Sequence, residues 1–483
     1  MVSIDLNSAA KLVDFSGGDP QMEALGRLQL EGAVALQNML ANPEVSLGYL
    51  ADEVGMGKTY TALGIVAMMR FFNPGYRVLY ICPSRNVQEK WFGRELPNFI
   101  KTNVLTRNFR VRTPHGDSGT PSISCANVDE LIHAATTGYY GDIFVRMSSF
   151  SIAMGEDEEG LERHLRELRE HVPNSVLGKV QQGKEGVKKA YARALNYLLP
   201  TFDLAVIDEA HNFKHSFESS ARNLTLSRIL GFNNEPGENY RRRVRSALLL
   251  SATPFDVNPM HLYNQLNMVG RAKLMPDHKH CEDKGRLRNA MACFMVRRLN
   301  ELVIQGKRHT RNMYRREWRK GERAEINFES DEHKLITALV QKHIGDELNR
   351  EGGNPSFQLG LLASFESYAQ TTRSGPVEFD GEKSPEVRND AKDRHLIAAI
   401  RDSYVVEESF GKSLPHPKMD QVSRETALLA LEKGRKQLVF VRRVKSVSEM
   451  KQKLDDVFDD WMRRHIDNVL ARFHDQLDFL KRV

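Results

Sequence analysis

The sequence predicts an α/β fold, with a parallel sheet flanked by helices and a second, incomplete α/β unit towards the C-terminus. Short, unbroken apolar runs recur through the first half of the chain, at Val45–Leu50, Val78–Cys82, Ile143–Val145, Leu204–Ile207 and Ala247–Leu250. Such runs are typical of strands that are buried on both faces, as in a parallel sheet between helices. Helical stretches such as Thr59–Phe72 lie between the runs, which is the alternation that an α/β fold requires.

Length and composition indicate a globular chain. The 483 residues are enough for about three compact units. Lys and Arg total 69 against 63 for Asp and Glu, a mildly basic balance that fits a polyanionic partner without requiring one. No apolar run approaches the ~20 residues of a membrane-spanning helix, and the N-terminus lacks the basic and apolar blocks of a secretory signal. We therefore expect a soluble, cytoplasmic protein without a membrane partner.

The cysteines argue against structural zinc and against a disulfide framework. All four are scattered, and no pair has the spacing of a metal knuckle. His278, His280 and Cys281 lie close together, but no second pair of ligands stands at a suitable distance, so we expect no metal site there.

Two segments interrupt the α/β pattern. Leucines at helical spacing among charged residues predict an amphipathic helix over Glu156–His171, within a helical insertion spanning about residues 155–200. Gly352–Glu386 is rich in Gly, Ser, Pro and charge, which is typical of a connector. The expected division is an N-terminal lobe over 1–310, a helical connector over 311–414, and the start of a second lobe over 415–483.

The second lobe looks incomplete. The apolar run Gln437–Val441 predicts one buried strand, and an apolar helical period then continues from Leu454 to Leu480. Because a single strand cannot make a sheet, the unit lacks most of an α/β core. The apolar stripe on the helix predicts self-association or partner binding.

The strongest local pattern is Ala51-Asp-Glu-Val-Gly-Met-Gly-Lys-Thr59, placed between a predicted strand and a predicted helix. Gly55 and Gly57 let the backbone turn tightly and bring its N–H groups against phosphate oxygens. Lys58 supplies a positive charge for the phosphates, and the Thr59 hydroxyl can ligate Mg²⁺. The general phosphate-loop pattern has a glycine where Asp52 stands, so that general pattern is not met.

A pair of acids follows another predicted strand. Asp208 and Glu209 come directly after Leu204–Ile207, and ligands of open α/β sheets bind at the carboxyl ends of the strands. Nucleotide hydrolysis needs one carboxylate to hold Mg²⁺ and another to orient or deprotonate water. Ser251-Ala-Thr253-Pro follows a third strand, and its hydroxyl groups can sense the state of the acids.

Taken in order, these segments resemble helicase superfamily two. Gln29, Asp52–Thr59, the DEAH sequence Asp208–His211 and Ser251–Pro254 are similar to its Q motif and motifs I, II and III. Several further segments resemble the Swi/Snf-like branch of that superfamily: DEVGMGKT itself, Leu79–Arg85 with Trp91 and Glu95 as motif Ia, Phe294–Arg298, and Pro417–Met419 with Gln437–Val441 as motif IV.

The resemblance implies a RecA-like motor that hydrolyses ATP when it is bound to nucleic acid, usually duplex DNA. It implies that Lys58 and Thr59 hold phosphate and Mg²⁺, that Asp208 holds Mg²⁺, and that Glu209 activates water. The expected cofactor-binding residues are Gln29, which would read adenine, Gly55, Met56, Gly57, Lys58, Thr59 and Tyr60. His211, Ser251 and Thr253 would couple the site to movement, and Pro83, Ser84 and Arg85 would face the nucleic acid. An intracellular, DNA-associated location follows.

The sequence departs from the family in the second lobe. Nothing after Val441 resembles motif V or the arginine motif that approaches the γ-phosphate, and an arginine of that kind is worth ~10³–10⁵ in rate. The similar composition of Gln305–Arg311 lies before the second unit, in the wrong order. Three interpretations stay open: a motor whose missing lobe belongs to a partner or a longer parent, an ATP-binding regulatory module with little hydrolysis, and a phosphate-loop ATPase or kinase that does not use nucleic acid. Gln29 and motif Ia disfavour the third.

Basic clusters offer a second route to nucleic acid. Arg297–Arg323 is rich in Lys and Arg and includes Tyr314 and Trp318, so it could neutralise phosphates. A solvated basic helix face explains the same pattern equally well. Arg241–Arg245 is a shorter and weaker cluster.

Overall fold

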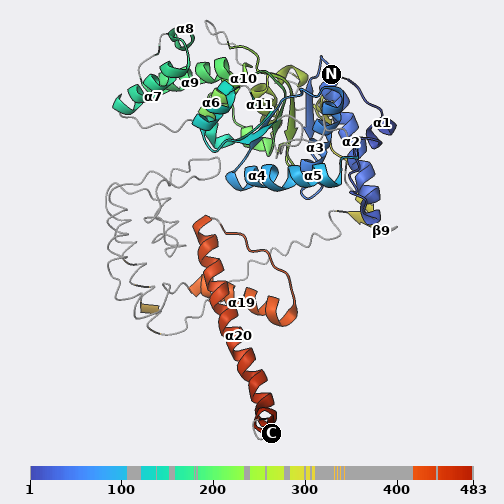
Figure 1. Ribbon diagram of the computed structural model, residues 1–483, viewed down its shortest axis with the longest axis vertical. Coiled ribbons are helices and arrows are strands. Elements are labelled where there is room, and N and C mark those ends of the chain that lie inside the picture. The colour runs from blue at the N-terminus through green and yellow to red at the C-terminus, as the bar shows by residue number, and fades with distance from the viewer. Residues whose placement is uncertain are drawn as a thin grey trace. The chain divides into compact units, whose positions relative to one another are not determined.

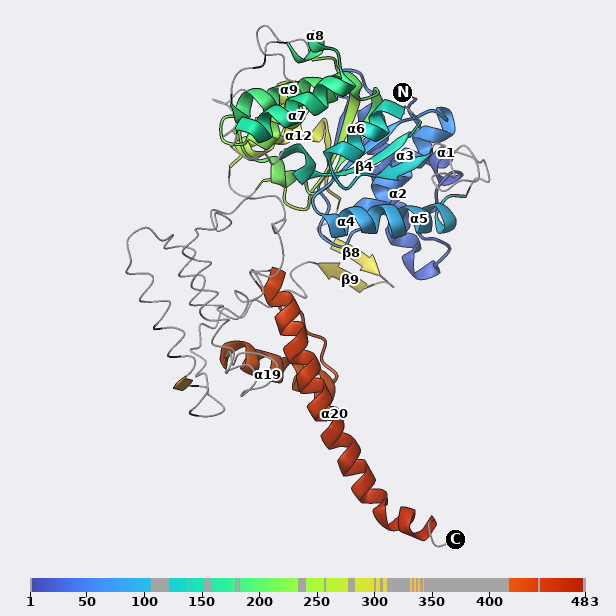
Figure 2. The ribbon, with the colours of Figure 1, turned by 60° about the vertical axis from the view of Figure 1, so that its left-hand side comes forward.

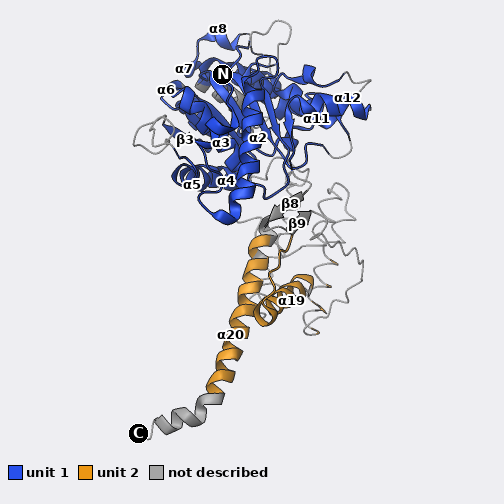
Figure 3. Ribbon diagram, turned by 90° about the vertical axis from the view of Figure 1, so that its right-hand side faces the viewer, with its two compact units in different colours: residues 1–317 blue, residues 318–483 orange. Residues whose placement is uncertain are grey.

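The computed structural model describes residues 2–105, 121–137, 139–151, 158–178, 180, 183–232, 240–255, 258–276, 283–298, 301–304, 307–310, 417–441 and 444–480, with single positions between 331 and 342. The chain divides into two compact units, residues 1–317 and 318–483, coloured separately in Figure 3. Each unit is described by itself.

The first unit is built on a seven-stranded sheet, seen in Figure 1, whose strand order is β3-β4-β2-β5-β6-β1-β7. All neighbouring strands of this sheet are parallel. Its strands are β1 (Leu47–Leu50), β2 (Val78–Cys82), β3 (Ser122–Ser124), β4 (Asp142–Arg146), β5 (Phe202–Ile207), β6 (Val244–Leu250) and β7 (Met295–Val296). The predicted parallel sheet is confirmed, and the five apolar runs form its five central strands. The edge strands β3 and β7 were not predicted.

One face of the sheet is covered by helices from the first quarter of the chain. Leu50, Tyr80, Val206 and Leu248 belong to the apolar core on this face. The elements that cover it are α1 (Leu6–Ala10), α2 (Glu23–Ala41), α3 (Lys58–Phe72), α4 (Arg85–Lys90), the π-helical turn η2 (Trp91–Glu95) and α5 (Leu96–Thr102).

Helices from later in the sequence cover the opposite face. Tyr49, Ile81, Ile207 and Leu249, which alternate with the residues of the first face, belong to this second core. The covering helices are α6 (Val128–Thr137), α9 (Lys184–Leu198), α10 (Ala221–Leu230), α11 (Met260–Met268) and α12 (Lys284–Ala292), as the rotated view in Figure 2 shows for several of them. Burial on both faces explains why the strands read as unbroken apolar runs.

The amphipathic helix expected over 156–171 is α7 (Glu158–His171). With α8 (Asn174–Leu177) and α9 it forms a small separate core around Leu168, Leu177, Val187 and Tyr191. Ala192 and Leu195 of α9 pack instead on the core of the sheet. Helix α9 therefore joins the insertion to the sheet. After β7 the chain forms a two-stranded antiparallel ribbon, β8 (Glu301–Ile304) and β9 (Lys307–Thr310).

The described part of the second unit is helical. Helices α19 (Pro417–Lys433) and α20 (Val444–Leu480) pack through a contact of 2.9 Å between Ser423 Oγ and Met450 Sδ, and through an ion pair of Asp420 with Lys453. None of the described helices combines the length and the hydropathy of a membrane-spanning segment.

The strand predicted at Gln437–Val441 is wrong. These residues join α19 to α20 without pairing to any strand in the described part of the chain. Leu438 is 78% exposed and Phe440 is 87% exposed. Without a neighbouring strand, the backbone groups of an apolar segment have no ladder to join, and its side chains stay in water.

Candidate active site

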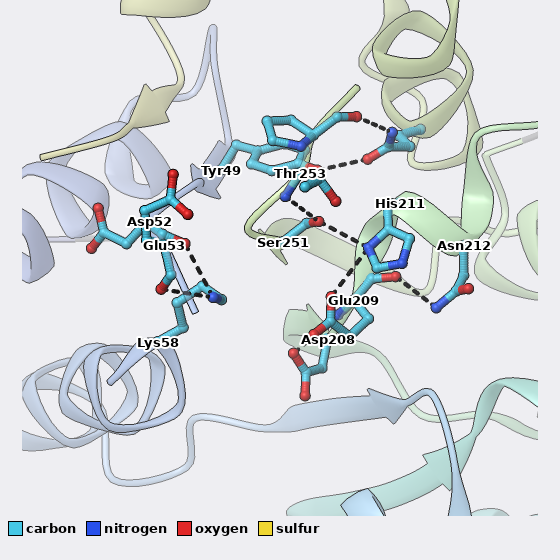
Figure 4. A network of polar contacts seen from close by, with 12 residues as sticks. Tyr49, Asp52, Glu53, Lys58, Asp208, Glu209, His211, Asn212, Ser251 and Thr253 are labelled. Atoms are coloured by element: carbon cyan, nitrogen blue, oxygen red, sulfur yellow. Dashed lines mark hydrogen bonds and ion pairs between the residues drawn. The ribbon is translucent and has the colours of Figure 1, made fainter. Parts of the chain in front are cut away.

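The predicted functional segments converge at one edge of the sheet. Because all strands of this sheet are parallel, the loops that follow β1, β2, β5, β6 and β7 all leave at its carboxyl edge. Strands β5, β6 and β1 are neighbours, so the loops that carry Asp208, Ser251 and Lys58 lie beside one another. Figure 4 shows these side chains facing a common space. This edge is where open α/β sheets bind ligands.

The loop after β1 has the backbone of a phosphate cradle. Gly55 and Gly57 take φ values of +84° and +72°, which side chains rarely adopt, and α3 begins at Lys58 directly after them. Gln29 of α2 donates from Nε2 to the carbonyl of Met56 at 2.9 Å. A Cβ on Gly57 would overlap the amide of Gln29 and displace it from this contact. The contact brings the predicted adenine reader against the loop.

Lys58 lies across the mouth of this loop. Its Nζ donates to the carbonyls of Asp52 and Glu53 at 3.1 and 3.2 Å, as Figure 4 shows. Both of these bonds go to neutral backbone groups, so they leave the ammonium charge for an anion. A helix N-terminus with glycines and a lysine is suited to triphosphate. Thr59 follows in the first turn of α3 and is half-buried. The residues present therefore fit ATP and Mg²⁺.

Tyr60, another predicted cofactor residue, contacts the elements that follow β2. Its ring packs on Phe99 of α5 with centroids 5.4 Å apart. Burial and the carboxylate of Glu95, with which it forms a hydrogen bond, raise the pKa of Tyr60. These contacts join α3 to α5 and involve no residue of the glycine loop.

Asp208 sits at the end of β5 with both carboxylate oxygens engaged. Oδ1 accepts from the backbone N–H of Glu209 at 3.0 Å, and Oδ2 accepts from the indole Nε1 of Trp91 at 3.1 Å. Burial, and then the charge of Glu209, raise the pKa of Asp208 to about 6, while both hydrogen bonds and the charge of Lys58 act in the opposite direction. Lys58 is thus within electrostatic reach of this acid across the site.

Glu209 has a left-handed backbone, with φ of +50°. Such conformations are uncommon for residues other than glycine and concentrate at functional sites. His211 Nδ1 lies 3.1 Å from Glu209 Oε2, and this hydrogen bond, together with the charges of His211 and Lys58, lowers the pKa of Glu209 against the opposing effect of burial. The environment thus favours the neutral form of Asp208 and the charged form of Glu209.

His211 connects this pair to the segment after β6. Its Nδ1 also lies 3.0 Å from Oγ of Ser251, which in turn accepts from the backbone N–H of Thr253 at 3.2 Å. Tyr49 of β1 lies beside Ser251 and donates to Oε1 of Gln265 at 2.7 Å. The predicted coupling residues His211, Ser251 and Thr253 therefore form one connected network with Glu209.

Gln265 extends the network to α11. Its Nε2 donates to the carbonyl of Pro254 at 2.7 Å and to that of His261 at 3.0 Å. Gln265 could not be predicted from the sequence, because Tyr49 lies 216 residues away along the chain and an isolated glutamine on a helix marks no site.

The predicted nucleic-acid segment begins α4 after β2. Ser84 caps this helix, its Oγ accepting from the N–H of Val87 at 3.4 Å. Arg85 is exposed and pairs with Glu89 at 2.7 Å, one turn later. Trp91, at the end of the same helix, carries the contact to Asp208. Part of the basic cluster 297–323, including Tyr314 and Trp318, lies outside the described residues, as do His278, His280 and Cys281.

Two arginines that follow β7 form ion pairs with acids at the start of the phosphate loop. The Asp52 carboxylate accepts from the backbone N–H of Arg298 at 2.9 Å and pairs with its guanidinium at 2.6 Å. Glu53 pairs with Arg297 at 2.9 Å, nearer the surface. Neither pair was predicted from the sequence. The acids and the arginines stand in segments that resemble family motifs, but the resemblance did not indicate that these segments contact each other.

One family model and several solved structures are similar to this chain. The family model described as "Type III restriction enzyme, res subunit" matches residues 18–256. The structure is similar to the Sulfolobus solfataricus SWI2/SNF2 ATPase core in complex with dsDNA, at 14% identity and a TM-score of 0.35 over 90% of this chain and 69% of that chain. It is also similar to the Pyrococcus furiosus Hef helicase domain, at 14% identity and a TM-score of 0.28 over 91% of this chain and 69% of that chain. No curated protein matches the sequence.

The family match covers the sheet from α2 to the segment after β6, including the phosphate loop, the DEAH acids and Ser251–Pro254. These segments lie on a parallel sheet with helices on both faces, the α/β fold that the sequence predicts. Residues 18–256, just under half of the chain, therefore match this family, whose domain is the N-terminal lobe of helicase superfamily two.

Proposed function

We propose that the protein is a nucleic-acid-stimulated ATPase of the Swi/Snf-like type, which couples ATP hydrolysis to movement along duplex DNA. The observation that carries this proposal is that Lys58, on the loop after β1, and Asp208, on the loop after β5, face one another closely enough for the lysine charge to lower the pKa of the acid. A cation and an acid pair at the same edge of the sheet are what a Mg²⁺-bound triphosphate requires on its two sides.

Each side chain has a distinct part in this reaction. Lys58 would leave the carbonyls of Asp52 and Glu53 and bind phosphate oxygens. Thr59 and Asp208 would hold Mg²⁺, which when bound neutralises phosphate charge. Glu209, kept anionic by His211, would accept the proton of the attacking water. Gln29, already against the loop, would select adenine.

Contact with nucleic acid is assigned to the segment that follows β2. Pro83, Ser84 and Arg85 resemble motif Ia, and Arg85 is exposed at the start of α4. Trp91 connects the same helix to Asp208, so a ligand on α4 has a direct route to the ATP site. The matched family is named for a restriction enzyme subunit, which favours DNA. The proposal includes an intracellular, DNA-associated location.

A second candidate function is an ATP-binding regulatory module with little hydrolysis. It is favoured by the absence from the sequence after Val441 of an arginine motif for the γ-phosphate. In the described residues from 417 onwards, two helices and an unpaired extended segment stand where a second sheet would begin. In this second function the γ-phosphate receives no arginine, whereas in the motor a protein partner or a further lobe would supply it.

The rate of ATP hydrolysis with and without duplex DNA separates the two functions. A motor hydrolyses ATP faster with DNA, and the DNA concentration for half-stimulation rises steeply when salt increases from ~50 to ~200 mM. Single-stranded DNA and RNA of equal length serve as controls for the duplex. Equal rates with and without each nucleic acid would favour the regulatory module.

A further inference from the structure

Arg298 joins three segments that are far apart in the sequence. Its guanidinium pairs with Asp52 at 2.6 Å and donates to the carbonyl of Leu28 in α2, while its backbone N–H donates to Asp52 at 2.9 Å. The side chain is only 12% exposed. The arginine therefore fixes the first turn of the phosphate loop to the helix that carries Gln29.

Arg298 also accounts for the burial of the Asp52 carboxylate. It stands at the position that is glycine in the general phosphate-loop pattern, and its side chain is 1% exposed. A buried carboxylate is costly unless it is paired and hydrogen-bonded, and Arg298 provides both kinds of contact. With its backbone N–H and its guanidinium, Arg298 engages both carboxylate oxygens of Asp52.

A glycine in α2 makes room for the arginine. Gly32 lies in the middle of this helix, where glycine is less favourable than alanine. A Cβ at this position would overlap the guanidinium of Arg298. The unfavourable choice of glycine is explained by the close passage of the arginine side chain.

The arginine acts on the lysine through the backbone. Lys58 Nζ is held by the carbonyls of Asp52 and Glu53, so the place of those carbonyls sets the place of the ammonium group. Arg298 fixes Asp52 through the carboxylate of that residue. Arg298 is also the second residue after β7, where the chain leaves the sheet, so the loop is tied to that exit.

We propose that Arg298 is a positioning residue for nucleoside triphosphate binding: it holds the start of the phosphate loop, and through it Lys58, in the geometry that accepts the phosphates. This inference rests on the proposed function, since it assigns the loop to ATP. Arg297 makes a parallel pair with Glu53, but that pair is exposed, with 46% of the arginine side chain accessible. Exposed pairs contribute little, so the two neighbouring arginines are expected to differ sharply.

The test uses the full chain and a fluorescent ATP analogue with Mg²⁺. Gly32→Ala adds one methyl group that displaces the guanidinium, in a helix that alanine otherwise favours. We expect it to weaken binding of the analogue by about tenfold and to raise KM for ATP with little change in kcat. Arg297→Ala is the matched control and is expected to leave the affinity within about twofold.

A double variant distinguishes loss of the Arg298 contact from a general loss of structure. Asp52→Asn with Arg298→Ala removes both charges together, so that no unpaired charge is left buried. This double variant is expected to bind the analogue as weakly as Gly32→Ala, and adding Gly32→Ala to it should cause no further loss. If Gly32→Ala weakens binding of the analogue by the same factor in the double variant as in the parent, the two changes do not act through the same Arg298 contact.

The outcomes separate this inference from the proposed function. If the parent protein fails to bind the analogue, the ATP site itself is wrong. If the parent binds and Gly32→Ala binds equally well, or if its melting temperature without nucleotide falls while affinity and KM stay unchanged, Arg298 does not position the loop.

Discussion

Trp91 Nε1 donates a hydrogen bond to Oδ2 of Asp208 at 3.1 Å, joining the end of α4 to the acid after β5. The indole is 2% exposed, and it begins the π-helical turn Trp91–Glu95 between α4 and α5. Turns of this kind are rare and occur frequently at functional sites. The contact makes α4, which begins at the predicted nucleic-acid segment, a neighbour of the predicted Mg²⁺ ligand. Any shift of α4 would change how that carboxylate is held.

We expect Trp91→Phe to raise the pKa of Asp208, because the indole hydrogen bond stabilises the charged form. Mg²⁺ binding requires the ionised acid, so the pH midpoint for Mg²⁺-dependent binding of ATP should move upwards. A pH series of binding titrations measures the midpoint. Trp461→Phe, in α20 of the second unit, is the control. An unchanged midpoint in Trp91→Phe would show that the indole does not act on Asp208.

The raised pKa of Asp208 also predicts how stability depends on pH. With a folded value of about 6 against 3.8 for the free side chain, the folded protein binds the extra proton between these values, so this group lowers stability as pH rises from ~4 to ~6. Asp208→Asn removes this effect. The parent should lose up to about 3 kcal/mol relative to the variant across that window, measured by urea unfolding without nucleotide. A difference that is constant from pH 4.5 to 7 would mean that Asp208 titrates normally.

Gly57→Ala and Gly55→Ala separate backbone strain from the contact with Gln29. Both residues have positive φ, so each alanine should cost about 1–2 kcal/mol of unfolding free energy. Only at Gly57 would the new methyl group also displace Gln29, since the space around Gly55 is open. We expect Gly57→Ala to lose the preference for ATP over GTP and Gly55→Ala to keep it. Competition binding with both nucleotides measures the preference for ATP over GTP. Equal preference in the two variants would show that Gln29 does not recognise adenine.

Ser251→Ala should uncouple the acids from the segment after β6. The hydroxyl contacts His211 and accepts from the N–H of Thr253, so its loss should cost about 1 kcal/mol of stability. Affinity for ATP should be nearly unchanged, because the serine does not belong to the phosphate loop. Stimulation of hydrolysis by duplex DNA should fall, in an assay with saturating ATP. Full stimulation in this variant would contradict a coupling role for Ser251.

The central sheet and most of its site could be predicted from local signals. The strands around Tyr80, Val206 and Leu248 are unbroken apolar runs because helices cover both faces of the sheet, and polar residues directly after such runs must meet at its carboxyl edge. The edge strand Met295–Val296 is only two residues long and pairs on one side only, so it has no apolar run long enough to predict a strand.

The remaining errors and omissions come from long-range pairing. Gln437–Val441 has the composition of a strand, but a strand exists only with a neighbour, which composition does not reveal. In the same way, Trp91 and Arg298 stood within segments that resembled motifs, while their partners Asp208 and Asp52 lie more than a hundred residues away in the sequence. Only the folded sheet brings these pairs together.

The most direct measurement is equilibrium binding of a fluorescent ATP analogue with Mg²⁺, alongside ATP turnover, for the parent, Lys58→Ala and Glu209→Gln. If the glycine loop and the DEAH acids form one ATP site, Lys58→Ala will show no detectable binding, and Glu209→Gln will bind the analogue and not hydrolyse ATP. Undiminished binding by Lys58→Ala, or turnover by Glu209→Gln equal to that of the parent, would contradict it.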